Sequence, residues 1–187
     1  MANQAYDEVY ATKDGWKEVP SKAPGEACRY SVRDLPEGKR YFTEVVMPLK
    51  GVTVDALQAR LTDAWTWWQH GNFKVTEKRP DGSMDYIFWP SPTPVVKLTC
   101  SMSPPEQRPD GAVRLYSTMK GTADGAYYFD LKNSDGGVVL TSRQLGVPRG
   151  LIPALMGIDK FAKTHILSEL GEFGFPLPKG SGFVGLK

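Results

Sequence analysis

The sequence contains only two cysteines, Cys28 and Cys100, which lie far apart along its 187 residues. Neither belongs to a CxxC motif or to a Cys/His set with the spacing of metal ligands. This scarcity excludes a structural zinc site and a disulfide framework. We therefore expect two reduced, buried thiols, and the sequence indicates neither a metal nor a cofactor.

Long apolar runs are also missing. No stretch approaches the roughly 20 apolar residues that a membrane-spanning helix needs. The N-terminus, MANQAYDEVY, carries acidic residues where a secretory signal carries basic ones, and no apolar run follows it. These absences predict a cytoplasmic protein that makes at most transient contact with a membrane.

An excess of charge of one sign is absent as well. The 23 basic and 21 acidic residues give a net charge of +2, and both kinds are interspersed along the chain. Proteins that bind nucleic acid usually gather their basic residues on one face. We therefore expect no nucleic-acid partner, and the charge pattern indicates no particular oligomeric state.

Three common catalytic signatures do not occur. The sequence has no GxSxG nucleophile elbow, no HExxH metal-binding helix and no Walker phosphate-binding loop. Each of these motifs fixes a nucleophile, a metal or a phosphate in a defined backbone setting. Without them, the sequence points to no specific reaction.

What is present is enough for one globular domain. Hydrophobic residues make up 41% of the chain, which is ordinary for a folded protein of this size. We expect an N-terminal extension over residues 1–14, forming a loose helix or a tail, and one domain over residues 15–175. The Gly-rich segment 176–187 predicts a flexible tail.

Nine short segments have the composition of β-strands, with period-2 alternation and turn formers between them. The connections are mostly short, which favours consecutive antiparallel hairpins. The expected strands are residues 16–19, 28–35, 40–47, 73–78, 83–89, 95–102, 112–119, 126–132 and 137–145.

Two segments have helical periodicity instead. The first begins after Thr53, a plausible N-cap, has apolar residues at spacings of three and four, and stops at Gly71. The second runs from about Pro148 to Phe173 and has a broad apolar arc that includes His165. We expect this second helix to be long enough to cross the whole domain.

The order of three strands, a helix, six strands and a long final helix resembles START-type lipid-binding domains of the helix-grip (START/SRPBCC, polyketide cyclase-like) superfamily. The resemblance covers residues 15–173. Besides the element order, it rests on Gly15-Trp16, the charged alternation over residues 28–35, the run Asp63-Ala64-Trp65-Thr66-Trp67-Trp68 and the strand end Tyr86-Ile87-Phe88-Trp89-Pro90.

The resemblance implies an α+β helix-grip fold, in which a curved antiparallel sheet of about nine strands wraps around the C-terminal helix. It also implies an internal apolar cavity that holds a sterol, a phospholipid, a polyketide or another apolar molecule. The element count independently favours a cavity, because one helix laid across nine curved strands cannot fill their interior.

Inward-facing positions of the strands and helices supply the candidate ligand contacts. Alternation places Tyr127, Phe129 and Leu131 of one strand, and Val113, Leu115 and Met119 of another, toward the interior. It turns Lys97, Arg114 and Arg143 outward; if they turned inward, they would mark a polar anchor. The candidate contacts are Trp65, Trp67, Tyr86, Phe88, Leu115, Tyr127, Phe129, Leu155, Ile158, Ala162 and His165.

Two functions fit these expectations. In the first, the protein binds or carries a hydrophobic small molecule or lipid without changing it. In the alternative, it is a polyketide cyclase/aromatase-like enzyme or a hydrolase that uses His165 as acid and base. A buried His165 that is satisfied by a backbone carbonyl or a strand hydroxyl would serve neither role. An interaction module without a ligand is a third and weaker reading.

Overall fold

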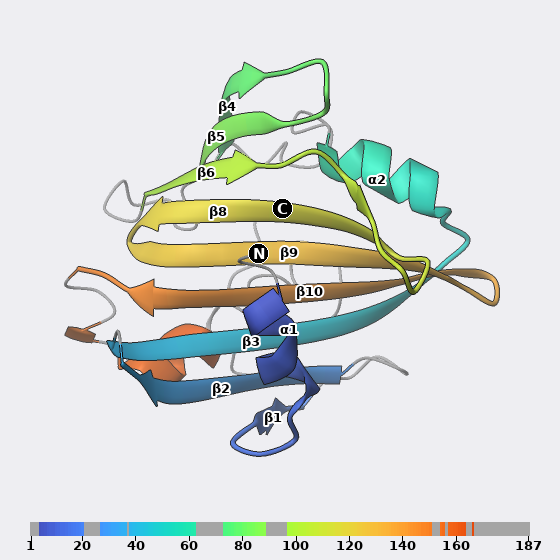
Figure 1. The fold of residues 1–187 in the computed structure, drawn as a ribbon. Coiled ribbons are helices and arrows are strands. Elements are labelled where there is room, and N and C mark those ends of the chain that lie inside the picture. The colour runs from blue at the N-terminus through green and yellow to red at the C-terminus, as the bar shows by residue number, and fades with distance from the viewer. Residues whose placement is uncertain are drawn as a thin grey trace.

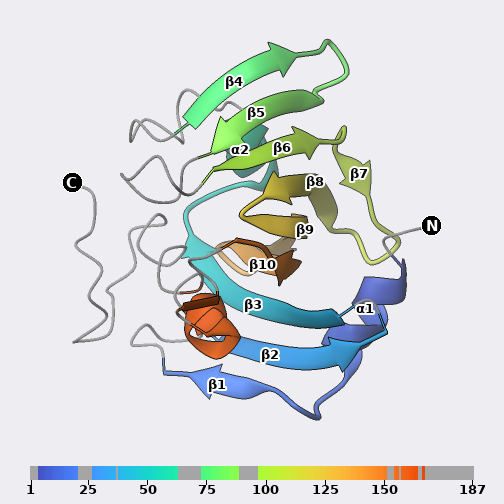
Figure 2. The same cartoon turned by 90° about the vertical axis from the view of Figure 1, so that its left-hand side faces the viewer.

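The computed structural model describes residues 4–20, 27–36, 38–62, 73–88, 97–150, 154–155, 157–163 and 166. Their dominant feature is one antiparallel sheet of ten strands in the order β1-β2-β3-β10-β9-β8-β6-β5-β4, with β7 paired to β8. The first three strands therefore join the rest of the sheet through the last strand, β10. Figure 1 shows this order, and Figure 2 shows how the sheet curves from β4 to β1.

The nine predicted strands are all present, and their boundaries shift by up to three residues. The two-residue strand β7 was not predicted. The strands are β1 (Lys17–Val19), β2 (Ala27–Leu35), β3 (Gly38–Lys50), β4 (Phe73–Lys78), β5 (Met84–Phe88), β6 (Leu98–Met102), β7 (Glu106–Gln107), β8 (Val113–Gly121), β9 (Ala123–Ser134) and β10 (Gly137–Pro148).

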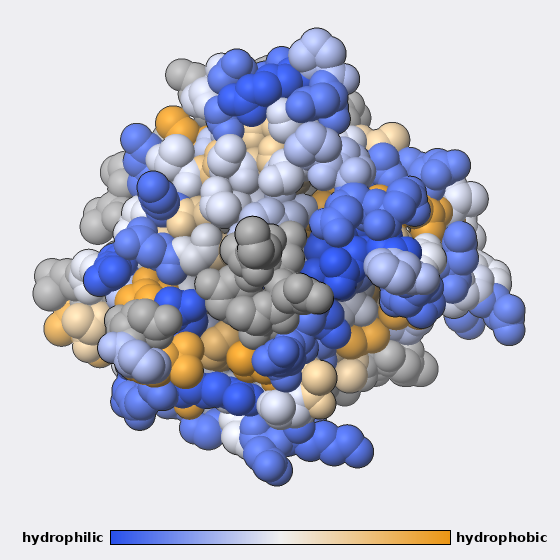
Figure 3. All heavy atoms as spheres, viewed as in Figure 1, coloured by the Kyte–Doolittle hydropathy of each residue, from blue (hydrophilic) through white to orange (hydrophobic). Residues whose placement is uncertain are grey.

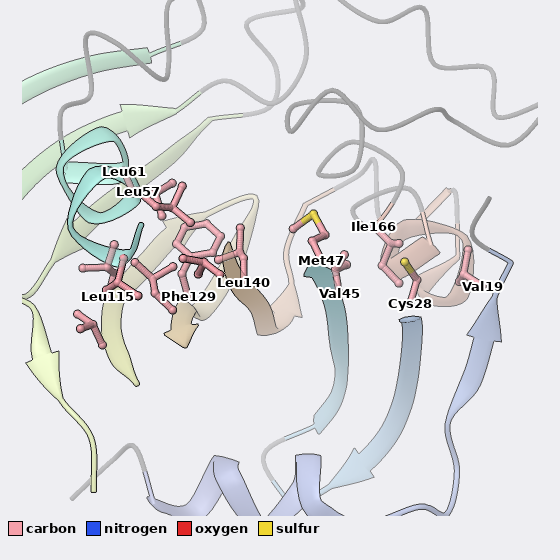
Figure 4. Close-up of a cluster of buried hydrophobic side chains, with 14 residues drawn as sticks. Val19, Cys28, Val45, Met47, Leu57, Leu61, Leu115, Phe129, Leu140 and Ile166 are labelled. Atoms are coloured by element: carbon pink, nitrogen blue, oxygen red, sulfur yellow. The ribbon is translucent and has the colours of Figure 1, made fainter. Parts of the chain in front are cut away.

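Helix α2 (Val54–Thr62) begins where the sequence predicts. The Thr53 hydroxyl accepts a hydrogen bond from the backbone N–H of Ala56 at 3.2 Å, which is the geometry of an N-cap. Leu57 and Leu61 are buried in the same core cluster as Leu115 and Phe129. Figure 4 shows these side chains gathered between α2 and the strands. The predicted stop at Gly71 lies outside the described residues.

The predicted C-terminal helix does not begin at Pro148. Pro148 ends β10, paired with Ala123, and does not open a helix. Gly157 is not helical and has a φ of 81°, a left-handed conformation that favours glycine. The described helical residues are 154–155, 158–163 and 166. A helix that runs unbroken from Pro148 is therefore wrong, and its predicted end at Phe173 lies outside the described residues.

The two faces of the sheet have different coverings. We call inner the face that packs against α2 and the helical residues 158–163 and 166. On this face Ile166 shares a core cluster with Cys28 and Val45, and the Phe161 ring meets Tyr41 edge-on at 5.4 Å. The outer face is covered by α1 (Gln4–Ala11). Figure 2 shows α1 and the helical residues near 160 on opposite sides of the sheet.

Helix α1 corresponds to the segment that the sequence assigned to an extension with a loose helix or a tail. Its Tyr10 is 3% exposed and packs against Phe42, Tyr128 and Leu145. The rings of Phe42 and Tyr128 both meet Tyr10 edge-on at 6.0 Å. Residues 4–11 of this segment therefore form a helix that buries part of the outer face. Figure 3, which views this side, shows a mostly hydrophilic surface with scattered apolar residues.

Candidate functional site

A row of hydrogen-bonding side chains crosses the inner face, perpendicular to the strands. Residues paired directly across antiparallel strands point to the same face of a sheet, so the strand register identifies the row. Tyr30 and Tyr127, its members on β2 and β9, pack against both inner core clusters. We call it the polar row, and it consists of Tyr30, Thr43, Gln144, Tyr127 and Ser117.

The rows on either side of the polar row are mainly apolar. The three rows together hold five residues each, fifteen positions, and none of these fifteen is charged. Thr43 and Ser117 are fully buried within them, whereas Tyr30, Gln144 and Tyr127 are partly exposed. The flanking rows are Cys28, Val45, Ser142, Phe129 and Leu115 on one side, and Val32, Tyr41, Gly146, Gly125 and Met119 on the other.

Hydrogen bonds fix part of this surface. Gln144 donates from Nε2 to the Tyr41 hydroxyl at 3.1 Å, and the same nitrogen lies 3.4 Å from the Met119 sulfur. Both contacts use Nε2, so Oε1 of Gln144 remains available as an acceptor. On the other side, the Tyr86 hydroxyl donates to Ser117 Oγ at 3.3 Å. The inner face therefore has a row of oriented polar groups between two mainly apolar rows.

Two ionisable side chains of the inner core, Tyr41 and Cys100, stay neutral near pH 7. Burial raises the pKa of Tyr41 far above its usual range, and the hydrogen bond from Gln144 only partly offsets it. Burial also raises the pKa of the Cys100 thiol to about 12. A protonated phenol and a protonated thiol can form hydrogen bonds, but neither acts as a base or a nucleophile.

The structure brings together six of the predicted contacts. Leu115, Tyr127 and Phe129 face the inner core clusters, as alternation predicts, and Tyr86 is buried in one of these clusters. Ala162 is fully buried there, and Ile158 packs against the same cluster.

The remaining predicted contacts lie elsewhere or outside the described positions. Leu155 is 78% exposed. Phe88 ends β5, but its side chain is not described. Trp65, Trp67 and His165 lie outside the described residues.

The sequence reasoning missed four members of the polar row, namely Tyr30, Thr43, Gln144 and Ser117. Alternation within residues 40–47 already places Thr43 on the same face as Tyr41 and Val45, which is a usable signal. Gln144 and Ser117 join it only through strand pairing, because β10 lies between β3 and β9. That pairing cannot be read from local patterns.

Charged side chains of the central strands lie on the outer face instead. Arg114 is 3% exposed and makes a bidentate pair with Asp130, at 2.6 Å and 2.7 Å, and it also donates two hydrogen bonds to Asp7 of α1. Arg143 donates to Glu44 at 2.6 Å. Alternation correctly turned both arginines away from the interior. Lys97, the third residue of that prediction, is exposed.

Within the described part of the chain, no group of three or more His, Cys, Asp or Glu residues has an arrangement that could hold a metal ion. None of the described helices combines the length and the apolar character that a membrane crossing demands.

Comparisons with known proteins identify the fold. The sequence matches no protein-family model and no curated protein. Among solved structures, the human StarD13 (DLC2) lipid transfer and protein localization domain aligns with a TM-score of 0.56 and 13% identity. The alignment covers 91% of this chain and 93% of that one. CalU16 from Micromonospora echinospora aligns with a TM-score of 0.45 and 12% identity, covering 83% and 88%. The alignment with the StarD13 domain shows that the chain has a START-type fold.

Proposed function

We propose that the protein binds or carries a hydrophobic small molecule or lipid against the inner face of the sheet. The observation that carries this proposal is the uncharged inner face, on which a row of polar side chains is set between apolar rows. Ligand sites for apolar molecules have this composition, with apolar walls and a few placed polar groups that fix orientation. The START-type fold supports the same choice, because the human domain that shares it is described as a lipid transfer domain.

Four described side chains of the predicted set are the proposed contacts, namely Tyr86, Leu115, Tyr127 and Phe129. We add Tyr30, Thr43, Gln144 and Ser117 from the polar row. The placement of Trp65, Trp67 and His165 against the ligand remains a prediction from sequence.

The chemistry of the described groups favours binding over catalysis. General acid–base catalysis near neutral pH works best with a group whose pKa lies near 7. The raised pKa values of Tyr41 and Cys100 keep both groups protonated there. These two residues therefore do not transfer protons at neutral pH.

Native mass spectrometry of the purified protein tests the proposal. We expect a species heavier than the 20.7 kDa chain, from which extraction with organic solvent removes a small molecule. The extracted protein should then regain the mass when the extract is added back. A bare chain mass in every preparation, together with no thermal shift from any hydrophobic probe, would overturn the proposal.

A further inference from the structure

Charged side chains are distributed unevenly between the inner and outer faces of the five central strands. The fifteen inner positions of the polar row and its two flanking rows carry no charged side chain. On the outer face of the same five strands, two rows carry five charged residues. These are Arg29, Glu44 and Arg143 in one row, and Asp130 and Arg114 in the other.

This division constrains the charge of a ligand. Burying an ion without a partner of opposite charge costs several kcal/mol, so buried charges in proteins are paired. The outer arginines cannot serve as partners, because they already pair with Glu44, Asp130 and Asp7 on the far side of the sheet. A ligand in contact with the three inner rows is therefore neutral where it touches them.

The polar row also constrains where the ligand carries its polar atoms. Neighbouring strands are spaced by about 4.8 Å, so a row across five strands extends for about 19 Å. Four hydroxyls and one amide are distributed along this length, and each hydroxyl can both donate and accept. A molecule with one polar end would meet only one of these groups. A molecule with several oxygens along one edge would meet them in series.

On the basis of the proposed function, we infer that the ligand is a neutral molecule with several hydroxyl, carbonyl or ether oxygens along one edge. It lies across the strands, with its oxygenated edge on the polar row and its hydrocarbon faces against the flanking rows. Fatty acids and phospholipids with charged headgroups do not fit this description over the three rows.

Three probes that share one ring skeleton separate the contributions of oxygen and charge. They are a dihydroxyanthraquinone, anthracene and an anthracene carboxylic acid, and binding is followed at neutral pH by quenching of the fluorescence of the five tryptophans. We expect the dihydroxyanthraquinone to bind most tightly and the carboxylate most weakly. Tighter binding of the carboxylate, or equal binding of anthracene, would overturn the inference and leave the proposed function intact.

A matched pair of substitutions locates the contact. Thr43→Val removes a hydroxyl from the polar row, and Thr141→Val makes the same change on the outer face of the adjacent strand. Loss of one hydrogen bond should weaken binding of the dihydroxyanthraquinone about 3–10-fold in Thr43→Val and leave anthracene binding unchanged. Thr141→Val should change neither. Equal losses for both probes in Thr43→Val would contradict the assigned contact. Gln144→Met provides a second test if Thr43→Val lowers the melting temperature.

The solvent extract from the native protein decides the remaining case, in which none of the three probes binds. A neutral formula with several oxygens supports the inference, whereas a fatty acid or a phospholipid overturns it alone. No extracted molecule and no probe binding would overturn the proposed function, and the inference with it.

Discussion

Tyr10 donates a hydrogen bond to the backbone carbonyl of Gln144 at 2.8 Å, although 134 positions separate the two residues. The side chain of Gln144 leaves the opposite face of β10, where it belongs to the polar row and donates to Tyr41. Helix α1 and the polar row therefore meet at one residue. Because Tyr10 is also almost completely buried, the outer helix helps to fix the backbone from which the inner site is built.

Replacing Asp7 tests how strongly α1 is attached. Asp7 accepts hydrogen bonds from two nitrogens of Arg114, both at 3.1 Å, and from Arg108 at 3.0 Å. Asp7→Asn should lower the free energy of unfolding by about 1–3 kcal/mol, because the buried guanidinium of Arg114 loses one of its two carboxylates. Urea denaturation measures this change. Glu8→Gln, an exposed change in the same helix, should stay within about 0.5 kcal/mol of wild type. Equal stability of all three proteins would contradict the prediction.

The contact between Asp7 and Arg114 also predicts that the stability of the protein depends on pH. Burial alone would raise the pKa of Asp7, but the hydrogen bond and the charge of Arg114 outweigh it, so the net shift is downward from 3.8. A carboxyl whose pKa is lower in the folded state stabilises the fold above its unfolded pKa, and this contribution is lost as pH falls through the folded pKa.

The stability difference between wild type and Asp7→Asn should therefore be full near about pH 6 and shrink toward about pH 2. Urea denaturation of both proteins at the two pH values measures it. Comparing the two proteins at each pH cancels the titration of the other carboxylates. A difference that stays constant with pH would show that Arg114 does not hold Asp7 in its charged form.

The sequence predicted the strands well, because each has local alternation and is bounded by turn formers. It failed at Pro148, where local chemistry is ambiguous. A proline suits both the first turn of a helix and the end of a strand, since its fixed φ and missing N–H are tolerated in either place. Only the pairing with Ala123 of β9 decides between them. The burial of Arg114 was equally invisible, because its partner Asp7 lies 107 positions away.

Both thiols should be protected from modification in the folded protein. Cys28 and Cys100 are both reduced and are 1% and 2% exposed. Burial raises the pKa of Cys100 to about 12, so its reactive thiolate is rare at neutral pH. Alkylation at pH 7 should be at least about 100-fold slower in the native protein than in guanidinium chloride. Intact mass should then show two added groups after denaturation. Fast labelling of either thiol in the native protein would contradict the burial.

Two facing glycines of the inner surface should respond very differently to the same substitution. Gly125 and Gly146 are paired across β9 and β10, in the flanking row that also contains Tyr41 and Met119. A Cβ atom on Gly125 would lie 2.7 Å from the Cα of Gly146 and would collide with the carbonyl oxygen of Leu145. Relieving these clashes requires the two strands to separate, because backbone atoms cannot rotate away.

At Gly146, by contrast, a Cβ atom would meet the ends of side chains, with the Tyr41 hydroxyl at 3.0 Å and the Met119 methyl at 3.2 Å. The flexible Met119 can yield. Gly125→Ala should therefore lower the free energy of unfolding by about 3 kcal/mol or more, and Gly146→Ala by about 1 kcal/mol. Urea denaturation of the two variants compares them directly. Because the methyl group of Gly146→Ala fills space beside the polar row, that variant should also bind the dihydroxyanthraquinone more weakly while remaining folded. Similar losses of stability in both variants would show that β9 and β10 do not approach as closely at Gly125 as the structure places them.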